Sequence, residues 1–338
     1  AFYFASYNIL VIKMKKKFWL FLFLLILCGV LVLIFIKFDF VKKDDNDTIV
    51  NHTYYDNSKS SIVMDVTTKR VLYQNNIHER MLPASTTKIL TCITAIEHYQ
   101  LDDFVVINSD VLKTEGSSIY LEVGDVISIK DLLYGLMLCS GNDAANALAL
   151  HYSGNMQDFI FLMNETAKKI GMYDSTFENP HGLDTTTKNY TTTYDMALLM
   201  SYAMKNETFK TITSTKDYHP TIISGKKMYY HNKHRLIQSD EKVTGGKTGY
   251  TKNAKRTLVT SFKQEDFEIV VVTFNCSDDW NVHEGLANYC FDKYKQKRIL
   301  SKFDVLFYAS FDQSYLIENE KLLVPIRESE TINYKIYE

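Results

Sequence analysis

Residues 83–99 read Pro-Ala-Ser-Thr-Thr-Lys-Ile-Leu-Thr-Cys-Ile-Thr-Ala-Ile-Glu-His-Tyr. From Thr86 to Tyr99 the apolar residues recur at helical spacing without a breaker, which predicts a helix that begins just after Pro83. Side chains three residues apart share one face of a helix, so the amine of Lys88 should approach the hydroxyl of Ser85. A serine hydroxyl becomes a strong nucleophile when a neighbouring base accepts its proton. A lysine is such a base only where burial or nearby cations favour its neutral form.

Two further short motifs carry groups suited to the same chemistry. Ser140-Gly141-Asn142 is expected on a loop between two helices, where the serine can relay a proton and the asparagine can bind a substrate carbonyl. Lys247-Thr248-Gly249 precedes a strand-like run, where lysine and threonine can hold a carboxylate and glycine admits a substrate backbone. Each motif alone is ordinary turn composition. Together and in this order they match the S-x-x-K, S-x-N and K-T-G signature of penicillin-binding proteins and class A β-lactamases.

The surrounding pattern predicts strands at both ends of a folded region and helices between them. Residues 61–66 and 70–73 form a predicted hairpin. Further helices and strands are expected from the periodicity of the apolar residues, namely helices at 130–138, 143–152, 158–170, 193–205 and 280–295, and strands at 257–262 and 267–274. This order favours an α+β fold in which helices flank an antiparallel sheet.

Four segments resemble the D-alanyl-D-alanine carboxypeptidase family of low-molecular-mass penicillin-binding proteins. They are residues 61–88, Leu138-Cys139-Ser140-Gly141-Asn142-Asp143-Ala144-Ala145, Asn179-Pro180-His181-Gly182-Leu183-Asp184 and Gly246-Lys247-Thr248-Gly249-Tyr250-Thr251. The resemblance extends over about residues 60–295. It implies a serine-acyltransferase fold, with a central antiparallel sheet, helices on both faces and a helical subdomain.

The resemblance also implies roles for individual residues. Ser85 would attack the carbonyl between two D-alanines of a peptidoglycan stem peptide, Lys88 would be the base and Ser140 the proton relay. Asn142 would bind the substrate or keep the catalytic side chains in place.

The binding residues are implied in the same way. Lys247 and Thr248 would bind the terminal carboxylate, and Gly249 would be a further substrate-binding residue. The backbone N–H groups of Ser85 and Tyr250 would form the oxyanion hole. No metal or cofactor is implied, and β-lactam antibiotics would acylate Ser85.

Three alternatives share this signature. A β-lactamase would need a glutamate that holds water, and Glu178 lies in the right interval but outside the E-x-x-L-N pattern. A DD-endopeptidase acting on cross-links would differ only in the leaving group that its cleft admits. A non-catalytic sensor of β-lactams or muropeptides would keep the same motifs.

The N-terminal region predicts attachment to a membrane. Residues before Met14 are interpreted as an upstream extension, and lysines 13 and 15–17 precede the apolar run 18–36. Nineteen uncharged residues approach the length that crosses a bilayer, and the preceding lysines place the remainder outside the cytoplasm. An uncleaved signal-anchor is favoured over secretion after cleavage, because no small-residue cleavage pattern follows.

The predicted organisation has four parts. Residues 1–40 form the extension and anchor, and 41–59 a polar linker. Residues 60–296 form the catalytic domain. Residues 297–338 form a small β-rich tail with strand-like runs at 305–310, 321–326 and 332–336.

The charge, the cysteines and the histidines do not indicate nucleic-acid binding or a metal site. The formal net charge of −2 gives no indication of the concentrated basic surface that binds nucleic acid. The five cysteines lack metal-ligand spacing and are expected to be mostly small apolar residues, although disulfides stay possible. His231 and His234 are expected to be surface residues without a metal, and His181 to be structural.

Lys255-Arg256 departs from the family pattern, and either alters substrate preference or forms a different surface turn.

Overall fold

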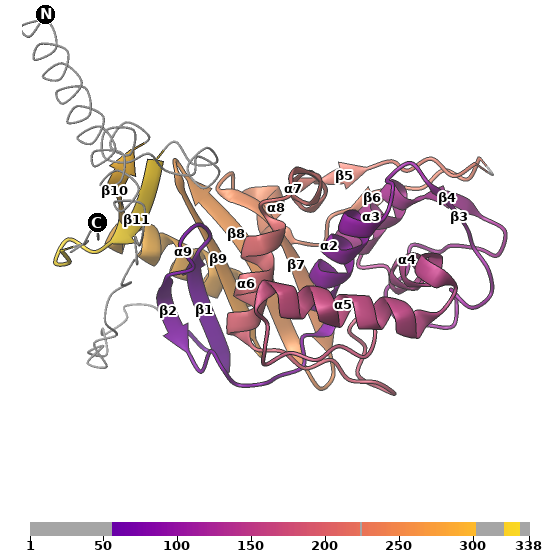
Figure 1. The fold of residues 1–338 in the computed structure, drawn as a ribbon, viewed down its shortest axis with the longest axis horizontal. Coiled ribbons are helices and arrows are strands. Elements are labelled where there is room, and N and C mark those ends of the chain that lie inside the picture. Colours follow the sequence, from indigo (N-terminus) through magenta and orange to yellow (C-terminus); the bar gives the residue numbers. More distant parts are fainter. Residues whose placement is uncertain (1–55, 224, 302–320, 332–338) are drawn as a thin grey trace, which may run out of the picture. The chain divides into compact units, whose positions relative to one another are not determined.

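The structure is a computed structural model that describes residues 56–223, 225–301 and 321–331. The described residues fall into two compact units, 56–294 and the described part of 295–331. Figure 1 shows the elements of each unit.

The larger unit contains a five-stranded sheet whose neighbouring strands all run antiparallel. Its strand order is β2 (Val71–Asn75), β1 (Ser60–Asp65), β9 (Phe267–Phe274), β8 (Lys255–Gln264) and β7 (Val243–Thr251). The N-terminal hairpin therefore joins the C-terminal strands through the β1–β9 pair. The predicted α+β fold and antiparallel sheet are confirmed.

Helices cover both faces of this sheet. Val272 on one face of β9 belongs to the main apolar core together with Met196 and Met200 of α6 (Thr193–Ala203). Thr273 follows on the opposite face, since successive strand residues alternate, and bonds His283 of α9 (Asp279–Lys293). The sheet is consequently buried on both sides, which agrees with the continuous apolar sequence of β9.

The helical subdomain lies beyond the β7 side of the sheet in Figure 1 and carries one wall of the site. It contains α3 (Ile129–Leu138), the alanine-rich α4 (Asn142–Ser153) and α5 (Met156–Ile170). Side-chain oxygens of Ser128 and Asn155 accept hydrogen bonds from the first turns of α3 and α5 and fix where these helices begin. Gly171 ends α5 with a φ of +98°, as its position in the sequence predicts.

Several short elements were not predicted because their periodic runs are too short to be recognised. They are β3 (Phe104–Val106), β4 (Val126–Ser128), α7 (Glu207–Ser214), β5 (Asp217–Tyr218), β6 (Tyr230–His231) and α8 (Arg235–Ser239). Two of them, α7 and α8, pack against β7 and so help to position the K-T-G motif.

The second unit is a hairpin of β10 (Lys295–Ser301) and β11 (Lys321–Ile326), paired antiparallel. The strand predicted at 321–326 is confirmed, whereas the predicted helix 280–295 ends two residues early, at Lys293. The runs at 305–310 and 332–336 lie outside the described residues.

The N-terminal predictions, from residue 1 to residue 55, also fall outside the described part of the chain. Among the residues that the structure does describe, no helix combines the length and the apolar character needed to span a bilayer. Within the same residues, Cys92, Cys139, Cys276 and Cys290 form no disulfide, and all but Cys139 are fully buried.

Candidate active site

Ser85 lies in a tight 3₁₀ turn, Ala84–Thr87, that leads into α2 (Lys88–His98). The α-helix therefore begins at Lys88, slightly later than predicted. Ala84 adopts a φ of +49°, a left-handed conformation that is strained for a residue with a Cβ. The Thr257 hydroxyl of β8 donates to the Pro83 carbonyl at 2.9 Å and fixes the chain just before this turn. The half-buried Ser85 side chain is thereby held at a fixed place.

The Asn179–Asp184 loop packs directly against the same turn. Gly182 has a φ of +89°, and a Cβ on it would overlap the carbonyl oxygen of Ala84. Asn179 closes the loop, since its Oδ1 accepts from the backbone N–H of Gly182 at 2.6 Å. Only glycine suits this position, because it combines the left-handed backbone with the close approach.

Lys88 is completely buried and makes three polar contacts. Its Nζ lies 2.8 Å from Asn142 Oδ1, 2.7 Å from the His181 carbonyl oxygen and 2.9 Å from Ser85 Oγ. The first two atoms can only accept hydrogen bonds. A neutral amine has two N–H groups and one lone pair, so it donates to these two atoms and accepts from the Ser85 hydroxyl. In the neutral form, the Lys88 lone pair therefore faces the proton of Ser85.

Burial is the main cause that lowers the pKa of Lys88 well below its ordinary value. The positive charges of Lys247 and Lys233 lower this pKa further, and the Asp143 carboxylate acts in the opposite direction. The neutral amine needed for a base is favoured by the site itself.

The S-x-N motif reaches the site from the loop between α3 and α4. Asn142 is the first residue of α4, and its side chain bridges Lys88 and the Glu115 carbonyl, to which its Nδ2 donates at 2.6 Å. Ser140 is buried two residues earlier, with a φ of +63°. In this structure Asn142 orients Lys88, while the described residues include no hydrogen bond between the Ser140 side chain and Ser85 or Lys88.

The K-T-G motif lies on β7, an edge strand of the sheet that precedes the predicted strand at 257–262. Lys247 is 1% exposed, and its Nζ donates to the Thr248 carbonyl at 2.9 Å. Burial, followed by the charge of Lys233, lowers the pKa of Lys247 to about 7. Thr248 beside it is partly exposed.

Gly249 brings β7 against the nucleophile turn. A Cβ at this position would lie 2.9 Å from the Ser85 backbone nitrogen and would overlap the Thr257 hydroxyl. The backbone of Ser85 therefore lies beside the residue that precedes Tyr250. The Tyr250 side chain is 64% exposed.

Two residues that were considered as catalytic candidates from the sequence, His181 and Glu178, have defined places. His181 contributes its backbone carbonyl to Lys88, while burial lowers the pKa of its ring to about 3. The carboxylate of Glu178 accepts from the Lys188 backbone N–H at 2.8 Å, which engages it within its own loop. Neither side chain contacts the Ser85 hydroxyl.

The expectation that His234 is a surface residue is wrong. It is 1% exposed, and its Nε2 lies 2.9 Å from the Thr260 hydroxyl on the α9 side of the sheet. His231 is exposed as expected and pairs with Asp217. Spacing alone could not reveal this difference, because the strand–helix junction at β6 and α8 was not predicted.

Arg256 has a structural partner. Its guanidinium donates twice to Asp279 Oδ1, at 3.0 and 2.8 Å, and stacks near Trp280. This ties the β7–β8 hairpin to the start of α9. The neighbouring Lys255 is exposed.

Some residues of the site were not found from the sequence. The Glu115 carbonyl accepts from the Asn142 side chain, and the Asn189 side chain donates to Thr87 and to the Asn179 carbonyl. The Asp143 carboxylate acts on Lys88 through its charge, which raises the pKa of that lysine. Loop residues of this kind carry no periodic signal. Of these loops, only the one with the Asn-Pro-His-Gly segment was singled out from the sequence, through its resemblance to the family.

A sequence model of the D-alanyl-D-alanine carboxypeptidase family matches residues 48–278, which include every residue of this site. The chain belongs to the D-alanyl-D-alanine carboxypeptidase family. The resemblance seen in the four motif segments is thus confirmed over most of the chain.

Individual family members show how far the likeness extends. The chain is 35% identical to the D-alanyl-D-alanine carboxypeptidase DacF of Bacillus subtilis over 75% of its length, and 34% identical to DacC of Escherichia coli over 69%. It spans 65% and 61% of the lengths of these two relatives.

Solved structures give the same result for the fold. The Streptomyces K15 DD-transpeptidase matches with a TM-score of 0.66 and 28% identity, over 71% of this chain and 99% of that one. A D-alanyl-D-alanine carboxypeptidase from Mycobacterium tuberculosis matches with a TM-score of 0.66 and 27% identity, over 70% of this chain and 91% of that one.

Proposed function

We propose that this chain is a serine-type D-alanyl-D-alanine carboxypeptidase that removes the terminal D-alanine from peptidoglycan stem peptides. The observation that carries the proposal is the contact between the buried amine of Lys88 and the hydroxyl of Ser85, in a member of this family. A serine paired with a neutral lysine is suited to acyl transfer without a metal.

Acylation begins when Lys88 accepts the Ser85 proton and Ser85 Oγ attacks the carbonyl between the two D-alanines. Asn142 and the His181 carbonyl hold the amine in place, so its lone pair keeps facing the nucleophile. The negative charge that develops on the carbonyl oxygen is stabilised by the backbone N–H groups of Ser85 and Tyr250. Such donors typically contribute about 3 kcal/mol each.

The leaving D-alanine requires a proton on its nitrogen. Ser140 passes the proton held by Lys88 to this nitrogen, after a small movement that brings its hydroxyl between the two. The C–N bond then breaks and leaves an ester on Ser85, and water hydrolyses this ester with Lys88 again acting as the base.

Release of D-alanine from a peptide that ends in Lys-D-Ala-D-Ala tests the proposal directly. The full chain should release one D-alanine per peptide, and pretreatment with benzylpenicillin should abolish the release. Covalent labelling by penicillin without any release would contradict the carboxypeptidase and favour a DD-endopeptidase or a sensor. Rapid turnover of penicillin would favour a β-lactamase.

Lys247 and Thr248, with Gly249 giving room for the substrate backbone, bind the free carboxylate of the terminal D-alanine. Lys247 has a pKa of about 7, so it loses its positive charge as the pH rises through 7. The KM for a free-carboxylate substrate should therefore rise above about pH 7, although the bound carboxylate opposes the loss of the proton. The KM for the same peptide with an amidated C-terminus should not rise with pH in this way.

The matching variant is Lys247→Met, which keeps the length of the side chain and removes its charge. It should raise the KM for the free carboxylate by about tenfold or more and leave the amide nearly unchanged, as expected for the loss of a charge-assisted bond. Steady-state kinetics at pH 6 and pH 8.5 measure both effects. Parallel changes for the two substrates would contradict the carboxylate role.

The binding partners follow from the same proposal, and the location is proposed separately. Stem peptides are the substrate, and β-lactam antibiotics acylate Ser85 because their strained amide resembles the dipeptide. We also propose that the apolar run 18–36 anchors the chain in the cell membrane, with the catalytic domain outside the cytoplasm. The support for this anchor is the sequence alone.

A further inference from the structure

One side of the strand that carries the K-T-G motif is not paired to the sheet, because β7 lies at its edge. Residues of an antiparallel strand alternate between those that exchange hydrogen bonds with the partner strand and those that point away from it. The Thr213 hydroxyl donates to the Gly246 carbonyl and accepts from the Gly246 N–H, both at 3.0 Å. Gly246 therefore points away from β8 and is paired with a side chain of α7 instead of a strand.

Thr213 takes the place that a neighbouring strand would fill at Gly246. A hydroxyl is both a donor and an acceptor, so one side chain satisfies the two backbone groups. Thr213 is completely buried, and a Cβ on Gly245 would overlap its methyl group. On the face of the strand, a Cβ on Gly246 would lie 2.5 Å from His234 Nε2. The two glycines are thus enclosed on the edge and on one face, which leaves this part of β7 little freedom to move.

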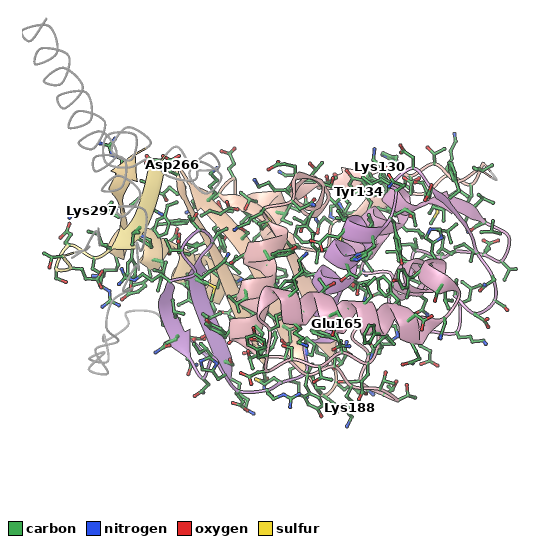
Figure 2. The ribbon with its side chains drawn as sticks, viewed as in Figure 1. Lys130, Tyr134, Glu165, Lys188, Asp266 and Lys297 are labelled. Carbon is green, nitrogen blue, oxygen red and sulfur yellow. The ribbon has the colours of Figure 1, made fainter. Side chains whose placement is uncertain are left out.

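Helix α7 packs against β7 and is itself firmly held (Figure 2). Its first turn is capped by the Asn206 side chain, which accepts from the Phe209 N–H at 3.0 Å. Phe209 is part of the main apolar core. At the other end, the Asn232 side chain donates to the carbonyls of Thr213 and Thr215, at 3.3 and 2.9 Å. The hydroxyl of Thr213 is therefore a fixed point against which the strand is placed.

The contact with α7 lies one residue before Lys247. At the other end of the motif, a Cβ on Gly249 would come within 2.9 Å of the Ser85 backbone nitrogen. The strand is thus held at two points, Gly246 against α7 and Gly249 against the nucleophile turn, and Lys247 and Thr248 lie between them. A shift of the strand at Gly246 would move both side chains relative to Ser85. A misplacement of about 1 Å can cost a factor of about 100 in rate.

We propose that Thr213 is a positioning residue of this enzyme, whose hydroxyl fixes the K-T-G strand relative to the Ser85 nucleophile. The inference rests on the proposed function, in which this strand binds the substrate. Without the hydroxyl, the buried N–H and carbonyl of Gly246 would lose their partner, and an unpaired buried backbone group is costly. The strand would then move until water or another polar group reaches Gly246, and the substrate would meet a displaced binding surface.

Two substitutions separate the hydroxyl from the volume of the side chain. Thr213→Val keeps the shape and removes both hydrogen bonds, and Thr213→Ser keeps the hydroxyl. Thr211→Val is the matched control, because Thr211 is exposed on the same helix. Ile212→Val is a second control, which reduces the packing of a buried residue of α7 and leaves the bonds to Gly246 in place. Each full-length variant is assayed on a peptide that ends in Lys-D-Ala-D-Ala.

For Thr213→Val we expect a KM about tenfold higher, because a buried pair of backbone groups loses its partner and the strand is displaced. The kcat should change by less than about threefold, since an interaction that binds substrate and transition state alike affects mainly the KM. Thr213→Ser and Thr211→Val should leave both constants nearly unchanged. Ile212→Val should lower the melting temperature without raising the KM. An unchanged KM in Thr213→Val, or an equal increase in Ile212→Val, would overturn the proposal.

The pH dependence of the KM gives a readout that a loss of stability alone would not change. Burial is the main cause that lowers the pKa of Lys247 to about 7. A displaced strand admits water to Lys247, so in Thr213→Val this pKa should rise and the KM should begin to increase at a higher pH. Thr213→Ser should keep the profile of the unmodified protein. An identical profile in Thr213→Val would contradict a displacement of the strand.

Two measurements separate this inference from the proposed function. Thr213→Val should slow acylation by benzylpenicillin about tenfold, and Thr213→Ser should restore it. That result without any D-alanine release by the unmodified protein would support Thr213 and contradict the carboxypeptidase. Exchange of the Gly246 amide hydrogen needs no variant, and it should be slow in the unmodified protein although β7 is an edge strand. Fast exchange would overturn the role of Thr213 even if D-alanine is released.

Discussion

Replacing Ser85 with alanine should abolish both D-alanine release and covalent labelling by penicillin. Removing the nucleophile of a serine peptidase costs up to about 10⁶-fold in turnover, so activity should fall to background. The fold should persist, because Lys88 keeps its contacts with Asn142 and the His181 carbonyl. The free energy of unfolding should change by no more than about 0.5 kcal/mol.

Intact-mass measurement after exposure to benzylpenicillin checks this result. The unmodified protein should gain the mass of one penicillin on the peptide that contains Ser85. Ser239→Ala, which removes an exposed hydroxyl from α8, is the matched control and should label normally. Labelling that survives in Ser85→Ala would remove Ser85 as the nucleophile.

Replacing Lys88 with arginine should lower the acylation rate by about 10³- to 10⁴-fold at every pH from 6 to 10. A guanidinium keeps the positive charge but does not give up its proton, so it cannot accept one from Ser85. General bases contribute about 10²- to 10⁴-fold, and this variant removes that contribution without removing the nucleophile. Stopped-flow acylation by a chromogenic β-lactam measures the rate. Retention of activity within tenfold would contradict the base role.

The unmodified protein provides a second measurement that does not depend on a variant folding. Lys88 acts as a base only after losing its proton, so the acylation rate should increase with pH and level off above the pKa of Lys88. Burial and the charges of Lys247 and Lys233 lower that pKa well below 10.5. The plateau should therefore begin well below pH 10.5. A rate that increases only near pH 10 would show that Lys88 is protonated in the working site.

The buried histidine at the back of the sheet illustrates where sequence reasoning failed. His234 was expected at the surface, yet its ring lies behind Gly246, where a Cβ would come within 2.5 Å of Nε2. The error came from a short strand and a short helix that carry no periodic pattern. Lys233, next to it, was not considered for the same reason.

Long periodic segments and the chemical identity of the motifs were determined by the sequence alone. The apolar runs of β8 and β9, the apolar spacing of α2 and the glycine after α5 indicate local structural preferences, which tertiary packing did not overrule. The three motifs likewise identified the groups of the site, because serine with lysine and lysine with threonine are the residue types that acyl transfer and carboxylate binding need.

Only the tertiary structure decided how these groups work together. The lowered pKa of Lys88 depends first on complete burial and then on the charges of Lys247 and Lys233, residues far from Lys88 in the chain. The direction of its lone pair depends on Asn142 and on a backbone carbonyl at His181, and no sequence pattern marks that carbonyl. Desolvation and Coulomb interactions act through space, so they exist only after the sheet and the helical subdomain have brought these residues together.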